Sequence, residues 1–552
     1  MKVLAAALGN CVHVAGIQAF LDMARGEGYE TVFLGPAVPV DKFVAAIREQ
    51  NPDLVAVGYR LSPESAKTIL EDLKTQLSSD PSLLSRRFMF GGTPPVCVVA
   101  AGSGLFEAIF DGNQSREQIT AVLRRQEEPD APLALGRDLE SRIRGRYPYP
   151  LIRHHFGLPN LQDTIAGVRK IAESRMVDIL SIAPDQNAQE SFFRAEEMDE
   201  RLSGSGGVPI RKPEDLMAIR EAALAGNHPL LRCYSGTRDL VKWGEMLKNT
   251  INIAWGAVPL FWYSELDGRS SRTLRDAITE NQQTILWYAD NRIPVEVNDS
   301  HQWALRACGD TIELATAYLA AYNAKALGVK TYICQFMFDT PKGISPAMDL
   351  AKMLAKAKLV ESLANGSFQV VRMVRPGLAS MSTWSNFAKG QLAASVFASM
   401  AIKPHIVHVV GFSEADHAST ADELIESCAI ARGAIEKALL GLPRSEIDPA
   451  VSSRKEMLLA DANLLIGAIK RVGLKYTGDP LTNPETLAEA VRLGLLDAAD
   501  LRGGKVARGT VATRVVGGAC VTIDKVSGKP IGEAERIGQL ASSEEDLDLT
   551  EL

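Results

Sequence analysis

Short apolar runs alternate with amphipathic helical segments in two long series along this chain of 552 residues. In the first series, strands are predicted over residues 3–8, 31–35, 54–58, 87–90 and 97–101. The helices of this series are predicted over residues 14–28, 40–49, 65–77 and 116–125. Strands that alternate with helices form a parallel sheet with helices on both faces. Residues 1–130 are therefore expected to form a Rossmann-like, flavodoxin-like domain.

The second series is longer and predicts a different α/β architecture. Residues 127–135, rich in proline and acid, are interpreted as a linker between the two series. Further strands are predicted over residues 177–183, 229–234, 251–263, 294–298, 329–338, 368–373 and 405–412. Seven strands separated by helices of similar length favour a TIM-like (β/α)₈ barrel over residues 161–443, with the eighth strand in 382–401 or after 440. A second doubly wound sheet is the alternative.

Two segments flank the predicted barrel. Residues 131–160 are expected to be a linker or strap, in which the basic and aromatic stretch 147–156 could pack between domains or contact a ligand. Residues 444–552 are expected to be a small α+β accessory region, with helices over 449–473 and 484–495 and a β-hairpin over 510–524. We interpret this region as a packing module whose acidic end, 542–552, is disordered.

Charge and cysteine usage narrow the class of protein. The formal net charge is −7, and there is no block of lysine and arginine, which argues against a nucleic-acid partner. No run of about 18 apolar residues or leader-like segment occurs, so no membrane span is expected. The seven cysteines form no Cys-x-x-Cys pair, which fits a reducing cytoplasm and disfavours zinc ribbons, iron–sulfur clusters and disulfides.

Three loops of the first domain combine glycines with chemically active side chains. Because the carboxyl ends of parallel strands meet at one edge of a sheet, these loops are expected to lie together where open α/β sheets bind ligands. A helix that begins near residue 12 would hold His13 in its opening turn. The candidate ligand-binding residues after the first, third and fourth strands are Cys11, His13, Gly16, Tyr59, Leu61, Gly91, Gly92 and Thr93.

This layout resembles the cobalamin-binding domain of B12-dependent mutases and methionine synthase. The pattern of that family is Asp-x-His-x-x-Gly, then Ser-x-Leu, then Gly-Gly. The resemblance implies cobalamin as cofactor, His13 as the lower axial ligand of cobalt, and glycines that let the backbone approach the nucleotide tail. A flavodoxin-like domain with an incidental histidine is the alternative.

The chain departs from that family pattern at two positions. Cys11 stands where the family has Asp, and Tyr59 stands where it has Ser. In the family, Asp orients the imidazole and raises its basicity, a role worth about 10–100-fold in metal affinity at comparable sites. A thiol is a weak hydrogen-bond acceptor and cannot fully replace a carboxylate. Tyr59 would fill space that the smaller Ser leaves for the nucleotide loop.

Polar side chains lie at or just after the carboxyl ends of the predicted barrel strands, at the face where such barrels place their active sites. These residues are Arg232, Arg238, Glu265, Asp267, Arg269, Asn298, Asp299, His301, Gln335, Asp339, Arg372, Arg375, Glu414, Asp416 and His417. Arginines suit bidentate binding of carboxylate or phosphate. We expect Arg232, Arg238 and Arg269 to bind a substrate carboxylate. Glu265 and His301 are the predicted acid and base.

The order of the predicted domains carries a second resemblance. The domain order is similar to that of the glutamate mutase (methylaspartate mutase) large subunit, and the segment 297–341 and the turn 494–501 (GLLDAADL) are part of the same likeness. This resemblance implies an adenosylcobalamin-dependent carbon-skeleton mutase that acts on a small carboxylate or amino acid. A methylcobalamin-dependent methyltransferase and a non-enzymatic corrinoid carrier or sensor are the alternatives. The expected partner is a small carboxylate substrate, and neither nucleic acid nor a membrane is expected as a partner. The sequence leaves open whether the chain forms a homodimer.

Overall fold

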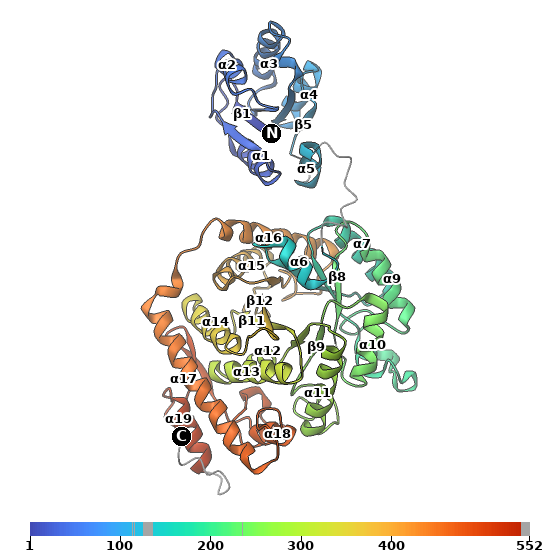
Figure 1. The fold of residues 1–552 in the computed structure, drawn as a ribbon, viewed down its shortest axis with the longest axis vertical. Helices are drawn as coiled ribbons and strands as arrows, with labels where there is room; N and C mark the ends of the chain where they lie inside the picture. Colours follow the sequence, from blue (N-terminus) through green and yellow to red (C-terminus); the bar gives the residue numbers. More distant parts are fainter. Residues whose placement is uncertain (113, 115, 125–135, 235, 543–552) are drawn as a thin grey trace. The chain divides into compact units, whose positions relative to one another are not determined.

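The computed structural model describes residues 1–112, 114, 116–124, 136–234 and 236–542. The chain forms two compact units, Met1–Asp130 and Ala131–Leu552 (Figure 1). The linker expected over 127–135 lies outside the described residues, and of the acidic end over 542–552 only Ser542 is described. None of the described helices has the length and apolar composition needed to cross a membrane.

The first unit is a parallel sheet flanked by helices, which confirms the Rossmann-like expectation. Its strand order is β2-β1-β3-β4-β5, and every neighbouring pair is parallel. The strands are β1 (Lys2–Ala7), β2 (Glu30–Phe33), β3 (Leu54–Tyr59), β4 (Arg87–Gly92) and β5 (Ala108–Phe110). The helices are α1 (Ala15–Gly26), α2 (Val40–Gln50), α3 (Pro63–Ser78), α4 (Pro94–Ser103) and α5 (Arg116–Arg124).

The strand predicted over residues 97–101 is wrong, because this segment lies inside helix α4. Thr93 precedes the helix in an extended conformation, and Pro94 occupies its first position. Proline is preorganised for that position and cannot supply the N–H that a strand interior needs. A short apolar run does not by itself distinguish a strand from a buried helix. The fifth strand, β5, follows this helix.

The second unit contains eight parallel strands in the order β8-β7-β6-β13-β12-β11-β10-β9, which confirms the TIM-like barrel. The strands are β6 (Leu151–Phe156), β7 (Ile179–Ile182), β8 (Leu230–Cys233), β9 (Gly256–Val258), β10 (Val295–Val297), β11 (Thr331–Phe338), β12 (Gln369–Pro376) and β13 (Ile406–His408). Strand β6 pairs with β13, so the first and last strands are neighbours. Between β8 and β9, the Ala254 N–H donates to the Leu231 carbonyl at 2.8 Å.

The eighth strand was expected at the wrong place in the sequence. It is β6, the first strand of the barrel, within the stretch 147–156 that we treated as a strap. The segment expected to hold it, 382–401, forms helix α15 (Ser385–Ser399) instead. Buried parallel strands usually read as continuous apolar runs. Strand β6 interrupts that pattern with Arg153 and His155, whose side chains contact other residues of the barrel interior.

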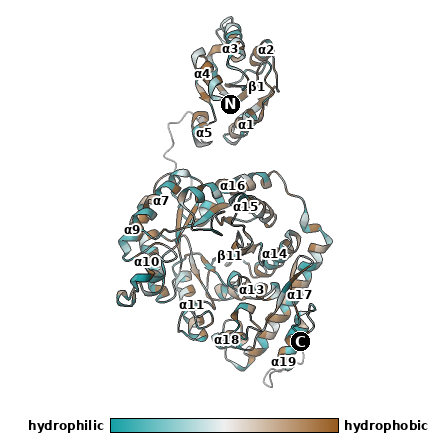
Figure 2. Cartoon of the chain, turned by 180° about the vertical axis from the view of Figure 1, so that it is seen from behind, coloured by the Kyte–Doolittle hydropathy of each residue, from teal (hydrophilic) through white to brown (hydrophobic). Residues whose placement is uncertain are grey.

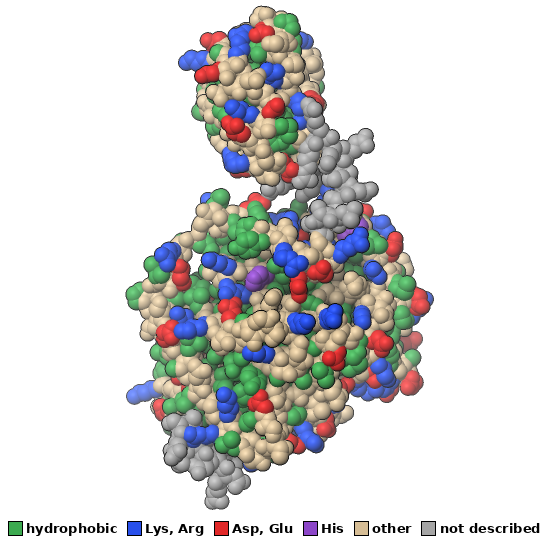
Figure 3. All heavy atoms as spheres, in the orientation of Figure 1, with side chains coloured by type: hydrophobic (Ala, Val, Ile, Leu, Met, Phe, Trp, Pro, Cys, Tyr) green, Lys and Arg blue, Asp and Glu red, His purple; other side chains and the backbone are tan. Residues whose placement is uncertain are grey.

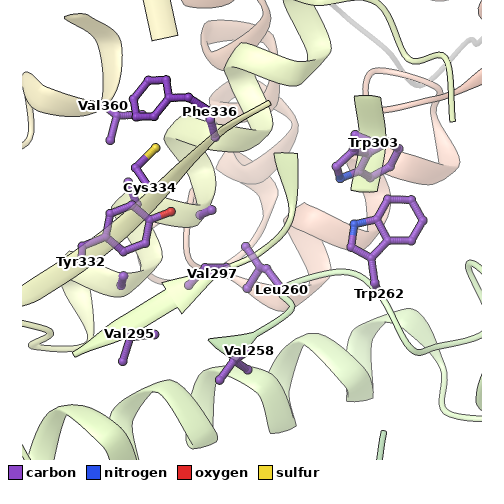
Figure 4. Close-up of a cluster of buried hydrophobic side chains, with 14 of the residues drawn as sticks. Val258, Leu260, Trp262, Val295, Val297, Trp303, Tyr332, Cys334, Phe336 and Val360 are labelled. Carbon is purple, nitrogen blue, oxygen red and sulfur yellow. The ribbon is translucent and has the colours of Figure 1, made fainter. Parts of the chain in front are cut away.

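Helices surround the barrel strands, and most of the core lies between the two layers. The helices within the barrel series are α7 (Leu161–Ser174), α8 (Gln186–Ser191), α9 (Pro213–Ala223), α10 (Leu240–Ile251), α11 (Leu274–Asp290), α12 (Ser300–Ala304), α13 (Asp310–Ala326), α14 (Pro346–Glu361), α15 and α16 (Ala421–Leu439). Hydrophilic and hydrophobic residues alternate along these helices, as expected when one face is buried (Figure 2). On β11, Tyr332, Cys334 and Phe336 project to the same side of the strand (Figure 4).

The C-terminal region belongs to the same compact unit as the barrel. Its elements are α17 (Pro449–Val472), α18 (Pro484–Arg492), the antiparallel hairpin β14 (Thr513–Val516) and β15 (Ala519–Thr522), and α19 (Glu533–Ser542). Helix α17 packs against α13 and α14. A short helix before the barrel, α6 (Leu139–Arg146), is anchored by Arg142, which donates to the carbonyls of Asp178 and His228. The boundaries that we predicted for the barrel domain, at residues 160 and 443, stay predictions.

Candidate functional site

A cavity of about 430 Å³ opens at the carboxyl edge of the sheet in the first unit. The structure brings six of the eight predicted ligand-binding residues to its wall: His13, Gly16, Tyr59, Gly91, Gly92 and Thr93. Cys11 and Leu61 are absent from this wall. Cys11 is fully buried beneath the first loop, whereas Leu61 is an exposed side chain.

The glycines of this cavity have two distinct roles. A Cβ atom built on Gly16 or Gly91 would meet no atom within 4 Å, so these positions leave open space at the cavity wall. A Cβ on Gly92 would lie 2.6 Å from the Tyr59 carbonyl oxygen. Gly92 therefore permits β4 to approach β3 closely. The first two glycines make room for a ligand.

Sequence reasoning missed the apolar walls of the cavity. They come from Phe20 and Met23 on α1, Phe110 on β5 and Ile119 on α5. The rings of Phe20 and Phe110 lie 6.0 Å apart between their centroids. These residues form part of the ordinary apolar faces of their elements, so no local motif distinguishes them from core residues. Only the packing of α1 and α5 beside the sheet brings them together.

His13 is exposed and lies in the loop before α1, which begins at Ala15. The expectation that it occupies the opening turn of the helix is therefore wrong. The loop is held in place by two contacts: the Tyr59 hydroxyl donates to Asn10 Oδ1 at 2.9 Å, and the Ala37 N–H donates to the Cys11 carbonyl at 2.9 Å. An exposed imidazole at the cavity wall is accessible to a metal held there.

Cys11 Sγ lies 3.9 Å from Nδ1 of His13. The thiol is fully buried, whereas the imidazole is exposed. This contact replaces the carboxylate–imidazole hydrogen bond of the family pattern with a long, weak one. Tyr59 is only 1% exposed and packs against the same loop. The cavity therefore combines the family's His and Gly positions with a different environment for the imidazole.

Comparison with known families identifies the first unit. Residues 1–98 match the B12-binding domain family. Cobalamin is therefore the cofactor of this chain, and most of the residues that line the cavity lie in the matched segment. No curated protein matches the chain in sequence.

Solved structures match the chain at low overall similarity. A novel cobalamin-binding protein from Desulfitobacterium hafniense DCB-2 is 22% identical with a TM-score of 0.20, and the match covers 22% of this chain and 58% of that one. A 2,3-dimethylmalate lyase of the PEP mutase/isocitrate lyase superfamily is 14% identical over 59% of this chain and 98% of its own, with a TM-score of 0.28. A cobalamin-dependent S-adenosylmethionine radical enzyme is 10% identical with a TM-score of 0.20, and the match covers 89% of this chain and 70% of that one.

A second candidate site lies inside the barrel, above a layer of apolar residues that includes Leu151, Ile179, Ile333, Val371 and Ile406. Glu296 on β10 is its central carboxylate. It accepts from Arg232 Nη2 at 3.0 Å and from Trp255 Nε1 at 2.8 Å, and lies 3.9 Å from Arg153 Nη1. The two guanidinium groups lie 5.4 and 5.5 Å from the Trp255 ring. All four side chains are buried.

Histidines and a tyrosine complete the polar layer toward the carboxyl ends of the strands. The Tyr234 hydroxyl lies 2.8 Å from His155 Nδ1, and the two rings stack. The ring centroids of His155 and His408 are 4.4 Å apart. Burial, followed by the nearby charge of Arg153, holds the pKa of both histidines well below the ordinary value. Both imidazoles are therefore neutral near pH 7.

Positive charge exceeds negative charge in this polar layer. Arg153, Arg232 and the partly exposed Arg375 all act electrostatically on His155 and His301. Glu296 neutralises one of these charges. Glu414 acts on Arg375 and also accepts from the Gly411 N–H at 2.7 Å, so the two glutamates offset two of the three guanidinium charges. Burial lowers the pKa of Arg153 to about 9, which leaves its guanidinium charged at neutral pH.

Several buried polar atoms at this site have no hydrogen-bond partner within the described residues. They are Arg232 Nε and Nη1, Asn298 Oδ1, His301 Nδ1 and Gln335 Nε2. Buried polar atoms are normally satisfied, so such a group of orphaned atoms indicates a place for a ligand or ordered water. The donors among them, beside an excess of guanidinium charge, fit an anion.

The five predicted catalytic residues divide between this site and its surroundings. Arg232 and His301 lie in it, and burial followed by the charge of Arg375 lowers the pKa of His301 well below its usual value. Arg238 instead donates to Glu197 at 2.6 Å. Arg269 is half exposed and stacks over Tyr263, and Glu265 accepts from the Leu274 N–H at the start of α11.

Sequence reasoning missed residues in the middle of the barrel strands. Arg153, His155 and Glu296 occupy positions inside β6 and β10, whereas we looked for candidates at or just after the ends of the strands that we had predicted. Charged residues within otherwise apolar strands were the available signal. Arg372 shows the opposite error: it donates to Glu361 of α14, so its side chain lies on the helix side of β12. Among the described residues, no group of three His, Cys, Asp or Glu side chains is arranged to hold a metal ion.

Proposed function

We propose that this chain is a cobalamin-dependent enzyme whose barrel binds a small carboxylate substrate. The unpaired guanidinium atoms of Arg232 carry the proposal, because they are buried, charged and directed to no protein acceptor within the described residues. Arg153 and Arg375 add positive charge beside it. A carboxylate can accept two parallel hydrogen bonds from one guanidinium group and would offset part of the buried charge.

Neutral histidines beside the arginines provide groups for proton transfer. A protonated His155 or His408 would add charge, but burial beside Arg153 keeps both neutral at pH 7. Each neutral imidazole can accept a proton or donate its N–H to the substrate. Tyr234, bonded to His155, and His301, with its unpaired Nδ1, are the groups that we propose for proton transfer. Arg238, Arg269 and Glu265 stay predictions for the outer part of the site.

The residues of the B12-binding domain fit the cofactor. Gly16 and Gly91 would leave room for the nucleotide tail beside the apolar side chains of Phe20 and Phe110, and His13 would approach cobalt. Bound adenosylcobalamin supplies an organic radical for rearrangement of a carbon skeleton. The barrel residues would bind the substrate, orient it and exclude water around it. A mutase acting on a small carboxylate is our preferred reaction.

Methyl transfer with methylcobalamin is the second candidate. The observation that favours it is the Cys11–His13 contact of 3.9 Å, which gives the imidazole no orienting carboxylate. A thiol in place of a carboxylate would make His13 a weaker ligand, and bound methylcobalamin would supply a methyl group. A corrinoid carrier or sensor without chemistry is a third possibility, and the same experiment tests it.

The test uses the full chain with adenosyl-, methyl- and hydroxocobalamin, each followed by absorption spectroscopy after removal of free cofactor. A panel of small mono- and dicarboxylates is then added to the adenosylcobalamin form, and cob(II)alamin is measured by electron paramagnetic resonance. We expect one class of acid to produce the radical signal. Arg232→Gln should lose it, whereas Arg201→Gln, at an arginine that is 88% exposed, should retain it. Cofactor retention without any response to acids or to methyl donors would contradict the enzyme proposal.

A further inference from the structure

A chain of buried charges connects the C-terminal region to α12, the short helix that carries His301. It contains three acidic residues, Asp310, Glu313 and Asp349, and three basic residues, Lys352, Lys356 and Arg454. Arg454 is 11% exposed, and the other five side chains are at most 2% exposed. The six formal charges balance, which is the arrangement that permits ions to stay buried.

The chain begins in the C-terminal region. Arg454 of α17 donates to Asp310 at 2.9 Å and to the Cys520 carbonyl of β15 at 2.7 Å. Lys352 lies 3.8 Å from the same Asp310 and 3.2 Å from Glu313. The hairpin also contacts the first turn of α14, where the Ser345 N–H donates to the Gly518 carbonyl at 2.8 Å. The C-terminal region is thus bonded to the N-terminal ends of both α13 and α14.

The chain ends at the residue beside His301. Lys356 lies 3.2 Å from Glu313 and donates to the Ser300 hydroxyl at 2.7 Å. Its ammonium group also lies 5.7 Å from the ring of Phe336, which packs beside Val360 (Figure 4). Ser300 and His301 are the first two residues of α12, a helix of only five residues. So short a helix has little stability of its own and depends on tertiary contacts.

We propose that Lys356 is a positioning residue for His301. Its ammonium group binds Ser300 and thereby fixes α12, and with it the imidazole of His301, at the carboxyl ends of the barrel strands. Glu313 holds Lys356 in place and also pairs with Lys352. Lys352 in turn shares Asp310 with Arg454 of the C-terminal region. The C-terminal region is then a structural part of the substrate site, and our interpretation of it as a passive packing module is replaced. The proposal rests on the proposed function only for the role of His301 toward substrate.

Hydrogen exchange tests the positioning directly in the full chain. In Lys356→Met and Ser300→Ala, amide exchange of residues 298–309 should accelerate by about tenfold, while residues 369–376 keep their wild-type rates. Lys356→Arg should retain the wild-type pattern, because it restores a donor to Ser300. Lys358→Met is the matched control on the same helix, since Lys358 is exposed and contacts Glu456. Unchanged exchange of 298–309 in folded Lys356→Met would overturn the proposal.

A double-mutant cycle separates positioning from a general loss of structure. Succinate binding is measured by calorimetry for wild type, Lys356→Met, His301→Gln and the double variant. Each single change should weaken binding by about tenfold, and the double variant should be no weaker than His301→Gln alone. Additive losses would show that Lys356 does not act through His301. If wild type binds no succinate or other small acid, the proposed function fails, whereas the exchange measurements still decide the positioning.

Discussion

Glu296 and Arg232 form a buried ion pair across the barrel interior, with Arg232 Nη2 donating to Glu296 Oε2 at 3.0 Å. The carboxylate also accepts from Trp255, so its two strongest contacts are to a cation and a neutral donor. Despite burial, which raises its pKa, the charges of Arg232 and Arg153 hold the pKa of Glu296 below its ordinary value. Glu296 is therefore an anion that organises the arginines, and the unpaired atoms of Arg232 are left for the substrate.

Glu296→Gln should destabilise the protein, because it leaves two buried guanidinium groups without their shared anion. Loss of one partner of a buried ion pair costs about 3–5 kcal/mol of the free energy of unfolding. Added succinate should restore part of the loss in the variant by supplying a replacement charge. Urea denaturation with and without succinate measures both effects. Equal destabilisation by Glu456→Gln, an exposed carboxylate on α17, would contradict the role assigned to Glu296.

His155 should make the stability depend on pH with a definite sign. Its pKa is lower in the folded state than in the unfolded chain, so the unfolded chain binds more protons as the pH falls below about 6.5. Its stabilising contribution is present above that pH and is lost during acidification. Asp299 and Asp349, whose pKa values burial raises to about 7, act in the opposite direction.

The His155 contribution is therefore measured as a difference. We expect the free energy of unfolding of His155→Gln to vary less steeply than that of wild type between about pH 5 and 6.5, by up to about 1.4 kcal/mol per pH unit. Chemical denaturation at a series of pH values gives this slope. His417→Gln is the contrasting variant, because Asp416 raises the pKa of half-exposed His417, so its loss should not make the slope less steep. A slope unchanged in His155→Gln would mean that His155 titrates normally.

Cys11→Asp should strengthen the ligation of cobalt by His13. A carboxylate beside Nδ1 would orient the imidazole and raise its basicity, for which the expected gain in metal affinity is about 10–100-fold. Fluorescence quenching gives the Kd for cobalamin, and electron paramagnetic resonance of the cob(II)alamin form gives the nitrogen splitting. Cys11→Ser is the uncharged control, and His13→Ala should abolish the splitting. A wild-type splitting that survives in His13→Ala would show that another group ligates cobalt.

Gly91→Val should reduce cobalamin binding by about tenfold or more without destabilising the domain, because valine favours strands and meets open space at this position. The side chain would occupy the cavity that we assign to the nucleotide tail. Gly102→Ala is the matched control, since it also lies in open space but is outside the cavity wall. Equilibrium dialysis with hydroxocobalamin and thermal unfolding provide the two measurements. If Gly91→Val binds hydroxocobalamin as tightly as wild type, the nucleotide tail does not occupy this part of the cavity.

The sequence by itself determined the features that depend on local pattern. Alternating apolar runs and amphipathic helices predicted the parallel sheet of the first unit and seven of the eight barrel strands. The spacing of His13, Gly16, Leu61, Gly91 and Gly92 led to cobalamin through its resemblance to the motif of a cobalamin-binding family. The predicted elements and the ligand-binding motif both depend on short stretches of sequence and not on contacts between distant residues.

Only the tertiary structure decided which polar residues face one another inside the barrel. Because β6 contains Arg153, we interpreted its segment as a strap and not as a barrel strand. In the structure Arg153 contacts Glu296, which is far away in the sequence. Lys356, in turn, reaches Ser300 from another helix. A charged residue within a strand is costly to bury unless a partner offsets its desolvation, and that partner is known only after the barrel closes. Local pattern therefore located the elements, whereas long-range pairing of charges formed the site.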